Sequence, residues 1–203
     1  TIVGKSGSGK STIFRLLLRF YKIENGEVLL DEKNIYDYTE DIYAKNVSLM
    51  AQKPFVFDMT IRENLSLIDS NREHQVTACK KAGIHNDIMK LPKGYDTVLE
   101  HDGANLSTGQ KQLLSLARVL LSKSEVLLFD EVTSSLDSTT TDKVMAVLEK
   151  LKKDHTVIMI THKPELMRLA DQIIVIDKGK VIGKGKHREL LKDNKIYQSL
   201  QEV

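Results

Sequence analysis

Several features are scarce in this chain of 203 residues, and each scarcity excludes a class of protein. The single cysteine, Cys79, excludes an internal disulfide and a CxxC metal site, which suits a reducing compartment. The net charge of +2 is too small to indicate a nucleic-acid surface. No apolar run approaches the roughly 20 residues that cross a bilayer, and no signal peptide is visible. With 41% hydrophobic residues, the composition predicts a globular protein.

An alternation of strand and helix patterns runs along the chain and indicates an α/β fold. Short unbroken apolar runs at 125–131 and 156–162 are typical of parallel strands that are buried on both faces. We expect a mostly parallel sheet formed by residues 1–51 and 122–203, with a mostly helical lobe, 52–121, inserted into it. Helical spacing of apolar residues predicts helices at 10–20, 72–83, 84–90, 107–121 and 139–152.

A glycine-rich octet, GKSGSGKS, lies between a strand pattern and a helix pattern at residues 4–11. It fits the phosphate-loop motif G-x-x-x-x-G-K-[ST] in the context that the motif requires, and an ordinary Gly/Ser turn is the weaker alternative. Such a loop cradles phosphate with its N–H groups, its lysine reaches the β- and γ-phosphates, and its last hydroxyl ligates Mg²⁺. We therefore expect a RecA-like P-loop NTPase core that binds ATP through Gly4, Lys5, Ser6, Gly7, Ser8, Gly9, Lys10, Ser11 and Thr12.

Polar side chains follow three of the predicted strands. Because adjacent strand residues face opposite sides, we expect Asp130 to hold the Mg²⁺ shell and Glu131 to orient or deprotonate a water at the γ-phosphate. His162 is the only one of the six histidines at the C-terminal end of a predicted core strand, the edge where open α/β sheets bind ligands. Gln52 also ends an apolar strand, so it is either an Mg²⁺ or water ligand or a polar loop residue.

A polar quartet, Ser107, Thr108, Gly109 and Gln110, stands directly before an apolar helix. Ser107 and Gln110 have the spacing of a capping box. Gly109 lies inside the first helical turn, where glycine costs about 1 kcal/mol relative to alanine. A helix start with a free hydroxyl and exposed N–H groups is also an anion site, so both interpretations stay open and are compatible.

Six elements occur in an order that resembles the ATP-binding cassette (ABC) ATPases. They are GKSGSGKST, Gln52, LSTGQ, VLLFDE, SSLD at 134–137 and His162, and the resemblance covers essentially the whole chain. Two further segments, QKPFVFDMTIRENL and LPKGYDTVL, resemble the exporter branch, in which this domain usually follows a transmembrane domain in the same polypeptide.

The resemblance implies an Mg-dependent ATPase at the cytoplasmic face of the cell membrane, whose two copies pack head to tail around two ATP molecules and power transport. Glu131 would be the general base, His162 would clamp the γ-phosphate, and Gln52 would sense Mg²⁺. The 107–110 quartet of one copy would face the phosphate on the partner's loop, and Asp137 would link the two sites. Partners would be a second nucleotide-binding domain and a transmembrane domain, without nucleic acid.

Two positions depart from the family pattern. Thr108 stands where the signature usually has glycine, and His101 stands where the exporter loop usually has glutamate. The chain begins without a methionine, so we expect a fragment that lacks the family's upstream adenine-stacking aromatic.

The partner domain can be a second copy or a different chain. An alternative function is a soluble ABC ATPase acting on nucleic acid or chromosomes, but the coiled coil or zinc modules typical of that class are not seen between Lys10 and Ser107.

Overall fold

The main sheet has six strands in the order β4–β5–β6–β1–β7–β8, and β8 alone runs antiparallel to its neighbour. A computed structural model describes residues 1–134 and 136–201. The expected α/β fold with a mostly parallel sheet is confirmed. The strands of this sheet are β1 (Ile2–Val3), β4 (Val47–Met50), β5 (Val126–Asp130), β6 (Thr156–Ile160), β7 (Ile173–Asp177) and β8 (Lys180–Gly185), and a separate hairpin joins β2 (Leu29–Leu30) to β3 (Lys33–Asn34).

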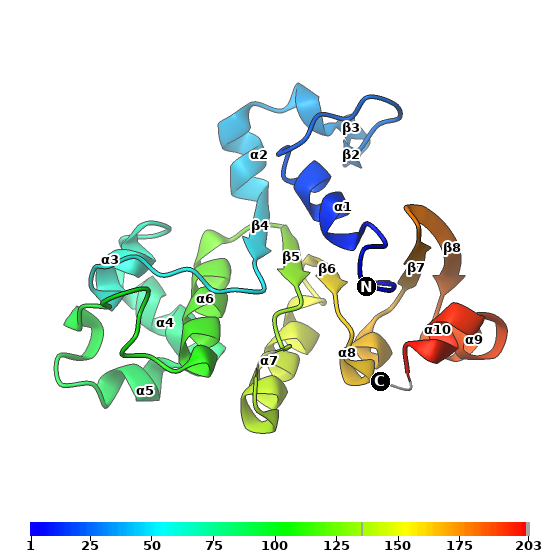
Figure 1. Cartoon of the computed structure of the whole chain (residues 1–203). Helices are drawn as coiled ribbons and strands as arrows, with labels where there is room; N and C mark the ends of the chain where they lie inside the picture. The colour runs from blue at the N-terminus through cyan, green and yellow to red at the C-terminus, as the bar shows by residue number, and fades with distance from the viewer. Residues whose placement is uncertain (135, 202–203) are drawn as a thin grey trace.

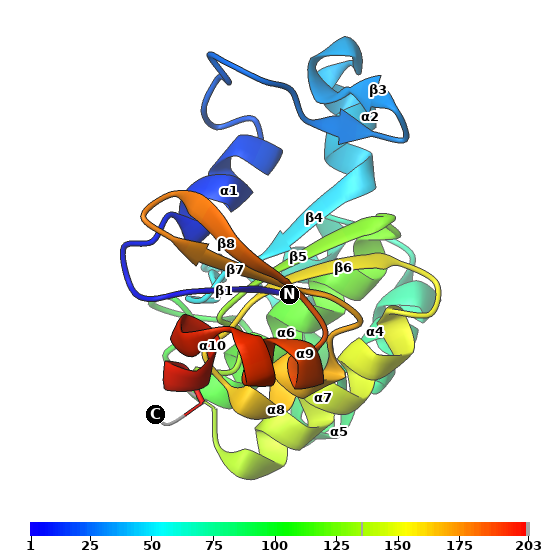
Figure 2. The ribbon, with the colours of Figure 1, turned by 90° about the vertical axis from the view of Figure 1, so that its right-hand side faces the viewer.

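Helices lie on both sides of the sheet, with α1 and α2 on one side and the remaining long helices on the other (Figures 1 and 2). The α1 helix ends at Leu17, earlier than expected, because Arg19 takes a left-handed φ of +58°. The helices are α1 (Lys10–Leu17), α2 (Glu40–Asn46), α3 (Ile61–Ser66), α4 (Arg72–Ala82), α5 (His85–Met89), α6 (Thr108–Ser122), α7 (Ser138–Leu151), α8 (Pro164–Leu169), α9 (His187–Asp193) and α10 (Lys195–Ser199), with short 3₁₀ turns at Ile35–Asp37 and Gly94–Asp96.

Two short helices, α2 and α8, are not predicted by the sequence pattern. They hold only 7 and 6 residues, so each spans less than the window in which helical periodicity becomes visible. For α8 a local signal does exist, because Pro164 occupies the first helical turn, where proline is favoured.

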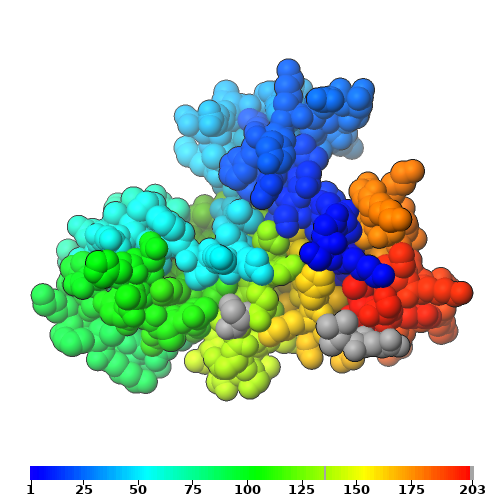
Figure 3. All heavy atoms as spheres, in the orientation of Figure 1, coloured from blue at the N-terminus to red at the C-terminus, as the bar shows by residue number. Residues whose placement is uncertain are grey.

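The helices α3 to α6 form a group beside the sheet, seen on the left of Figure 1 and as the cyan and green atoms of Figure 3. One hydrophobic cluster joins this group to the sheet, since it includes Cys79 of α4, Leu116 of α6, Phe129 of β5 and Val144 of α7. The position of α6 relative to the sheet is therefore set by buried packing. Among the described residues, no helix has the length and apolar character needed to span a membrane.

The register of the parallel strands brings their carboxyl ends together. Asp130 of β5 pairs with Ile160 of β6, and Ile160 in turn pairs with Ile2 of β1. The residues that follow these three strands therefore emerge at one edge of the sheet, where α/β folds place their ligands.

Candidate active site

The loop between β1 and α1 is shaped to receive phosphate. Gly9 caps α1 with a left-handed φ of +105° and no side-chain cap, so the first N–H groups of the helix stay available. A Cβ atom on Gly4 would collide with the carbonyl oxygen of Ile176, which excludes larger residues there. Lys10 is buried, and its Nζ atom donates to the carbonyl oxygens of Gly4 (2.8 Å) and Lys5 (2.9 Å). Its ammonium thus lies along the loop that would hold the phosphates.

A cavity of about 240 Å³ lies over this loop. The phosphate loop supplies most of its lining, and two of the predicted catalytic residues complete it. The lining residues are Ser6, Gly7, Gly9, Lys10, Ser11, Thr12, Glu131 and His162. The structure therefore brings together the loop, the candidate base and the candidate clamp.

The charges at this cavity perturb one another. Burial raises the pKa of Asp130, and the neighbouring Glu131 charge raises it further, against the attraction of Lys10 and a hydrogen bond from Ser11. Burial lowers the pKa of Lys10, while Glu131 and Asp130 act in the opposite direction. The edge of the sheet thus carries a partly buried carboxylate whose ionised form is disfavoured by burial in spite of the nearby Lys10.

Glu131 is held between the two other predicted catalytic residues. Its Oε2 atom accepts a hydrogen bond from Gln52 Nε2 at 2.8 Å, and its Oε1 atom lies 3.1 Å from His162 Nε2. The expected alternation of Asp130 and Glu131 within one strand is wrong in detail. The strand ends at Asp130, and Glu131 takes a left-handed φ of +47°. The N–H group of Glu131 donates to the Ile160 carbonyl oxygen. This turn, and not the pleat of a strand, separates the two carboxylates.

The donor set suits Mg²⁺ bound together with phosphate. No group of three or more His, Cys, Asp or Glu side chains that could hold a metal occurs in the part of the chain that the structure describes. Ser11, at the end of the phosphate loop, and Asp130 are instead near neighbours, since the Ser11 hydroxyl acts to lower the pKa of Asp130. Mg²⁺ is typically held by one or two such oxygen ligands plus substrate phosphates and water, so these residues fit the ion.

The signature quartet lies apart from this cavity. Ser107 caps α6 in a complete capping box, since its Oγ atom accepts from Gln110 N (3.1 Å) and Gln110 Oε1 accepts from Ser107 N (2.9 Å). The predicted cap is therefore confirmed. In Figure 1 the first turn of α6 lies far from the loop before α1. Among the described lining residues of the cavity, none comes from the quartet.

Asp137, which the resemblance predicts to link the two sites, caps the neighbouring helix α7. Its carboxylate accepts from Thr140 N (2.9 Å) and Thr140 Oγ1 (2.8 Å). A Cβ atom on Gly109 would lie 3.3 Å from Thr140 Oγ1, so the starts of α6 and α7 are in close contact. Within the SSLD motif, Ser135 lies outside the described residues, as do Glu202 and Val203 at the end of the predicted core.

Sequence reasoning missed one residue of this network, Gln112 of α6. The side chain is fully buried, and its Nε2 atom donates to the Gln52 carbonyl oxygen at 2.9 Å. The signal in the sequence is weak, because it consists only of one amide in a helix that is otherwise apolar on that face.

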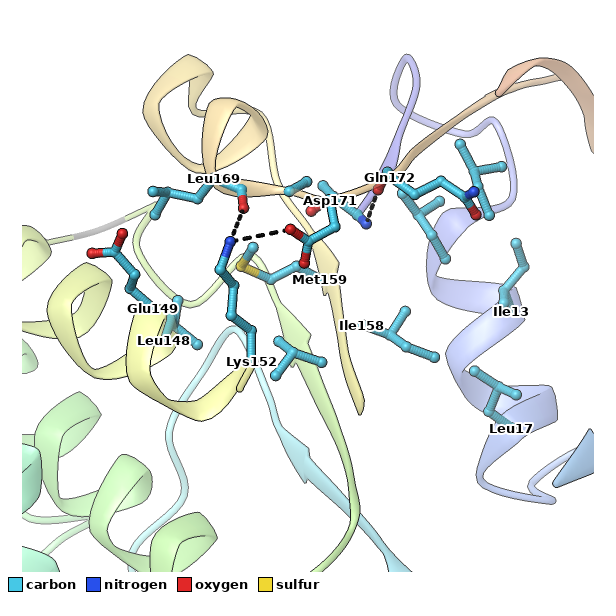
Figure 4. A pocket seen from close by; sticks show the side chains of 15 residues that line it. Ile13, Leu17, Leu148, Glu149, Lys152, Ile158, Met159, Leu169, Asp171 and Gln172 are labelled. Atoms are coloured by element: carbon cyan, nitrogen blue, oxygen red, sulfur yellow. Dashed lines mark hydrogen bonds and ion pairs between the residues drawn. The ribbon is translucent and has the colours of Figure 1, made fainter. Parts of the chain in front are cut away.

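An apolar cavity of about 450 Å³ lies away from these groups, at the amino ends of β1, β6 and β7 (Figure 4). Ile13 and Leu17 of α1 face it from one side. On the other side, Lys152 donates to the Leu169 carbonyl oxygen (3.0 Å) and pairs with Asp171 (3.3 Å). Its described lining contains no residue of the phosphate loop, so we do not assign nucleotide to it.

Comparisons with known proteins agree with this geometry. The family model described as ABC transporter matches residues 1–134. The whole chain is 44% identical to an ATP-dependent lipid A-core flippase of Haemophilus influenzae (strain 86-028NP), and covers 35% of that protein. It is 39% identical over 98% of its length to an ABC transporter ATP-binding protein of Bacillus subtilis (strain 168), and covers 33% of it.

A solved structure described as a bacterial Atm1-family ABC exporter with ATP bound shares the fold. It matches with a TM-score of 0.93 and 35% identity over 98% of this chain and 35% of that one. The chain thus spans about a third of the length of the relatives that it matches. The ordered motifs, the shared sheet edge and these likenesses lead to one conclusion: the chain belongs to the ABC transporter family.

Proposed function

We propose that this chain is the motor domain of an ABC exporter, which binds and hydrolyses ATP and thereby drives transport across a membrane. One observation carries the proposal: Glu131 is held between Gln52 and His162 at the mouth of the phosphate-loop cavity. A carboxylate fixed at two oxygens beside a phosphate site is suited to orient a water and to accept its proton.

Each residue has a distinct task in the proposed reaction. Lys10 exchanges its two carbonyl contacts for phosphate oxygens, and the free N–H groups at the start of α1 bind the same charge. Ser11, Asp130 and Gln52 hold Mg²⁺, which neutralises phosphate charge when it is bound. His162, whose Nε2 atom lies 3.1 Å from Glu131 Oε1, contacts the γ-phosphate. The loop residues Gly4 to Thr12 enclose the remaining phosphates.

We further propose that two such domains close head to tail. Ser107 and Thr108 of the α6 quartet are exposed, and the quartet is distant from its own phosphate loop, which is the arrangement expected if it completes a partner's site. In this proposal Asp137 lies between the two sites. Residues 1–51 and 122–203 form the ATP-binding core, and 52–121 form the signature subdomain. The full-length protein includes a transmembrane domain and places this domain at the cytoplasmic face of the membrane.

Light scattering on Glu131→Gln, with and without Mg-ATP, tests the proposal. The substitution preserves shape but removes the base, so the ATP-bound dimer should accumulate and turnover should be lost. Adding Ser107→Ala should abolish the dimer, and omitting Mg²⁺ should abolish turnover in the unmodified protein. A Glu131→Gln variant that still hydrolyses ATP at the original rate, or that stays monomeric in both the chain and the full-length protein, would contradict it.

A further inference from the structure

Gln112 occupies a position where a polar side chain is costly. It is 0% exposed, and it lies on α6 beside Leu113 and close to Leu116, which are both buried. Its Nε2 atom donates to Gln52, but its Oε1 atom has no hydrogen-bond partner among the described residues. A buried unpaired acceptor destabilises a fold, and an apolar side chain of equal size would avoid that cost. Stability alone therefore does not explain this amide.

The one side-chain hydrogen bond that Gln112 makes to the described residues holds the loop that carries Gln52. This loop joins β4 to α3, and α6 contacts it at two carbonyl oxygens. Gln112 donates to the Gln52 oxygen at 2.9 Å, and Arg118 donates to the Phe55 oxygen at 2.8 Å. The Gln52 side chain is itself exposed, so its direction depends on where its backbone is held.

The contacts continue without interruption to the candidate base. Gln112 holds the Gln52 backbone, the Gln52 side chain donates to Glu131 Oε2 at 2.8 Å, and Glu131 Oε1 lies 3.1 Å from His162. The first member of this series lies one helical turn after the start of α6, the helix that begins with the signature quartet. A displacement of α6 would carry the Gln52 carbonyl oxygen with it.

We propose that Gln112 is a positioning residue for ATP hydrolysis, which sets the orientation of Glu131 by holding the backbone of Gln52. The inference rests on the proposed function. It assigns to Gln112 no contact with nucleotide, so its loss should lower kcat and leave the KM for ATP nearly unchanged. A misplaced hydrogen-bond donor to the base should cost about tenfold in kcat, in the range expected for one hydrogen bond.

The experiment compares Gln112→Met with Gln75→Met in the full-length protein. Methionine matches glutamine in length and helix preference but cannot donate. Gln75 is a control of the same residue type, because it is also 0% exposed and leaves its Oε1 atom unpaired among the described residues, while its Nε2 atom donates to the Asp69 carbonyl oxygen and to Ser66 Oγ, both at 2.9 Å. It lies on α4, and neither of these two hydrogen-bond partners is a predicted site residue. Gln75→Met should lose at least as much thermal stability as Gln112→Met, but only Gln112→Met should lose turnover.

A second variant shows whether Gln112 acts through Gln52. Gln52→Ala keeps the carbonyl oxygen that Gln112 contacts but removes the amide that reaches Glu131. In that background, Gln112→Met should still lower the melting temperature and should no longer lower kcat. A tenfold loss that persists there, or equal turnover in Gln112→Met and Gln75→Met, would overturn the inference alone. A full-length protein without any ATP turnover would refute the proposed function as well.

Discussion

Replacing Ser107 by alanine separates a helix cap from a contribution to a partner's active site. Alanine keeps the backbone N–H that donates to Gln110 Oε1, so only the bond from Gln110 N to Ser107 Oγ, 3.1 Å long, is lost. Loss of one such cap costs about 1 kcal/mol of folding free energy. For a domain of this size that corresponds to a fall of roughly 2–4 °C in melting temperature.

The chain contains a matched control for this cap. Thr60 caps α3 with the same capping box, in which its Oγ1 atom accepts from Glu63 N at 3.1 Å and Glu63 Oε2 accepts from Thr60 N at 2.8 Å. The Thr60 hydroxyl in addition donates to Glu63 Oε2 at 2.7 Å. Thr60→Ala should therefore lower the melting temperature by at least as much as Ser107→Ala. Thr60 has no assigned role at the nucleotide site, so turnover should be retained.

The two variants should differ in ATP turnover. A hydrogen bond to a charged group contributes about 1.5–3 kcal/mol, so loss of the Ser107 hydroxyl from a phosphate should reduce turnover roughly 10- to 150-fold. Thermal unfolding, ATP binding by the monomer and steady-state hydrolysis are measured on both proteins. If Ser107→Ala hydrolyses ATP as fast as Thr60→Ala, the quartet is a cap only, and its assignment to a partner's site is refuted.

Two further substitutions test the charges of the site. Lys10→Ala should abolish binding of a fluorescent ATP analogue, because the phosphate charge loses its partner. Lys184 is an exposed lysine on β8, so Lys184→Ala should leave binding intact. Unchanged affinity of Lys10→Ala would refute the assignment of the phosphate loop. Asp130→Asn should raise the melting temperature of the nucleotide-free chain at pH 7, because a raised pKa means that ionisation of Asp130 destabilises the fold. A raised pKa means that the protonated carboxyl favours the fold, and this stability is lost as pH rises through the folded-state pKa of Asp130. The stability gained by Asp130→Asn should therefore shrink as pH falls toward 3.8, where the carboxyl of the unmodified protein is protonated as well. A lower melting temperature of Asp130→Asn at pH 7 would contradict this reasoning.

Local signals accounted for the parts of the site that are contiguous in sequence. The phosphate loop is one run of residues between a strand and a helix, so its motif predicts both the backbone shape and the position of Lys10. Gln52, Glu131 and His162 are far apart in sequence, but each follows an apolar strand. A parallel sheet gathers such residues at one edge, so the rule of strand ends was sufficient to predict that they meet.

Other features depend on contacts that no local pattern encodes. The partner of Gln112 is a backbone carbonyl oxygen 60 positions away, and any residue type supplies such an oxygen. The left-handed φ of Glu131 likewise follows from the end of β5 at Asp130 and from the bond to the Ile160 carbonyl oxygen, which exists only once β6 is in register. Alternation along a strand could not show it, since the strand had already ended.

The two helix starts that meet at Gly109 differ in what they can bind. Ser107 uses one oxygen lone pair to cap α6, and a hydroxyl still has a proton to donate. Asp137 caps α7 with a carboxylate, whose pKa is lowered by the hydrogen bonds from Thr140, so this start carries a negative charge. Phosphate would be repelled by the cap of α7 and attracted by that of α6, although each cap accepts a hydrogen bond from a backbone N–H of its helix. Serine instead of aspartate at the N-cap of α6, position 107, is therefore the feature that makes this helix cap compatible with an anion site.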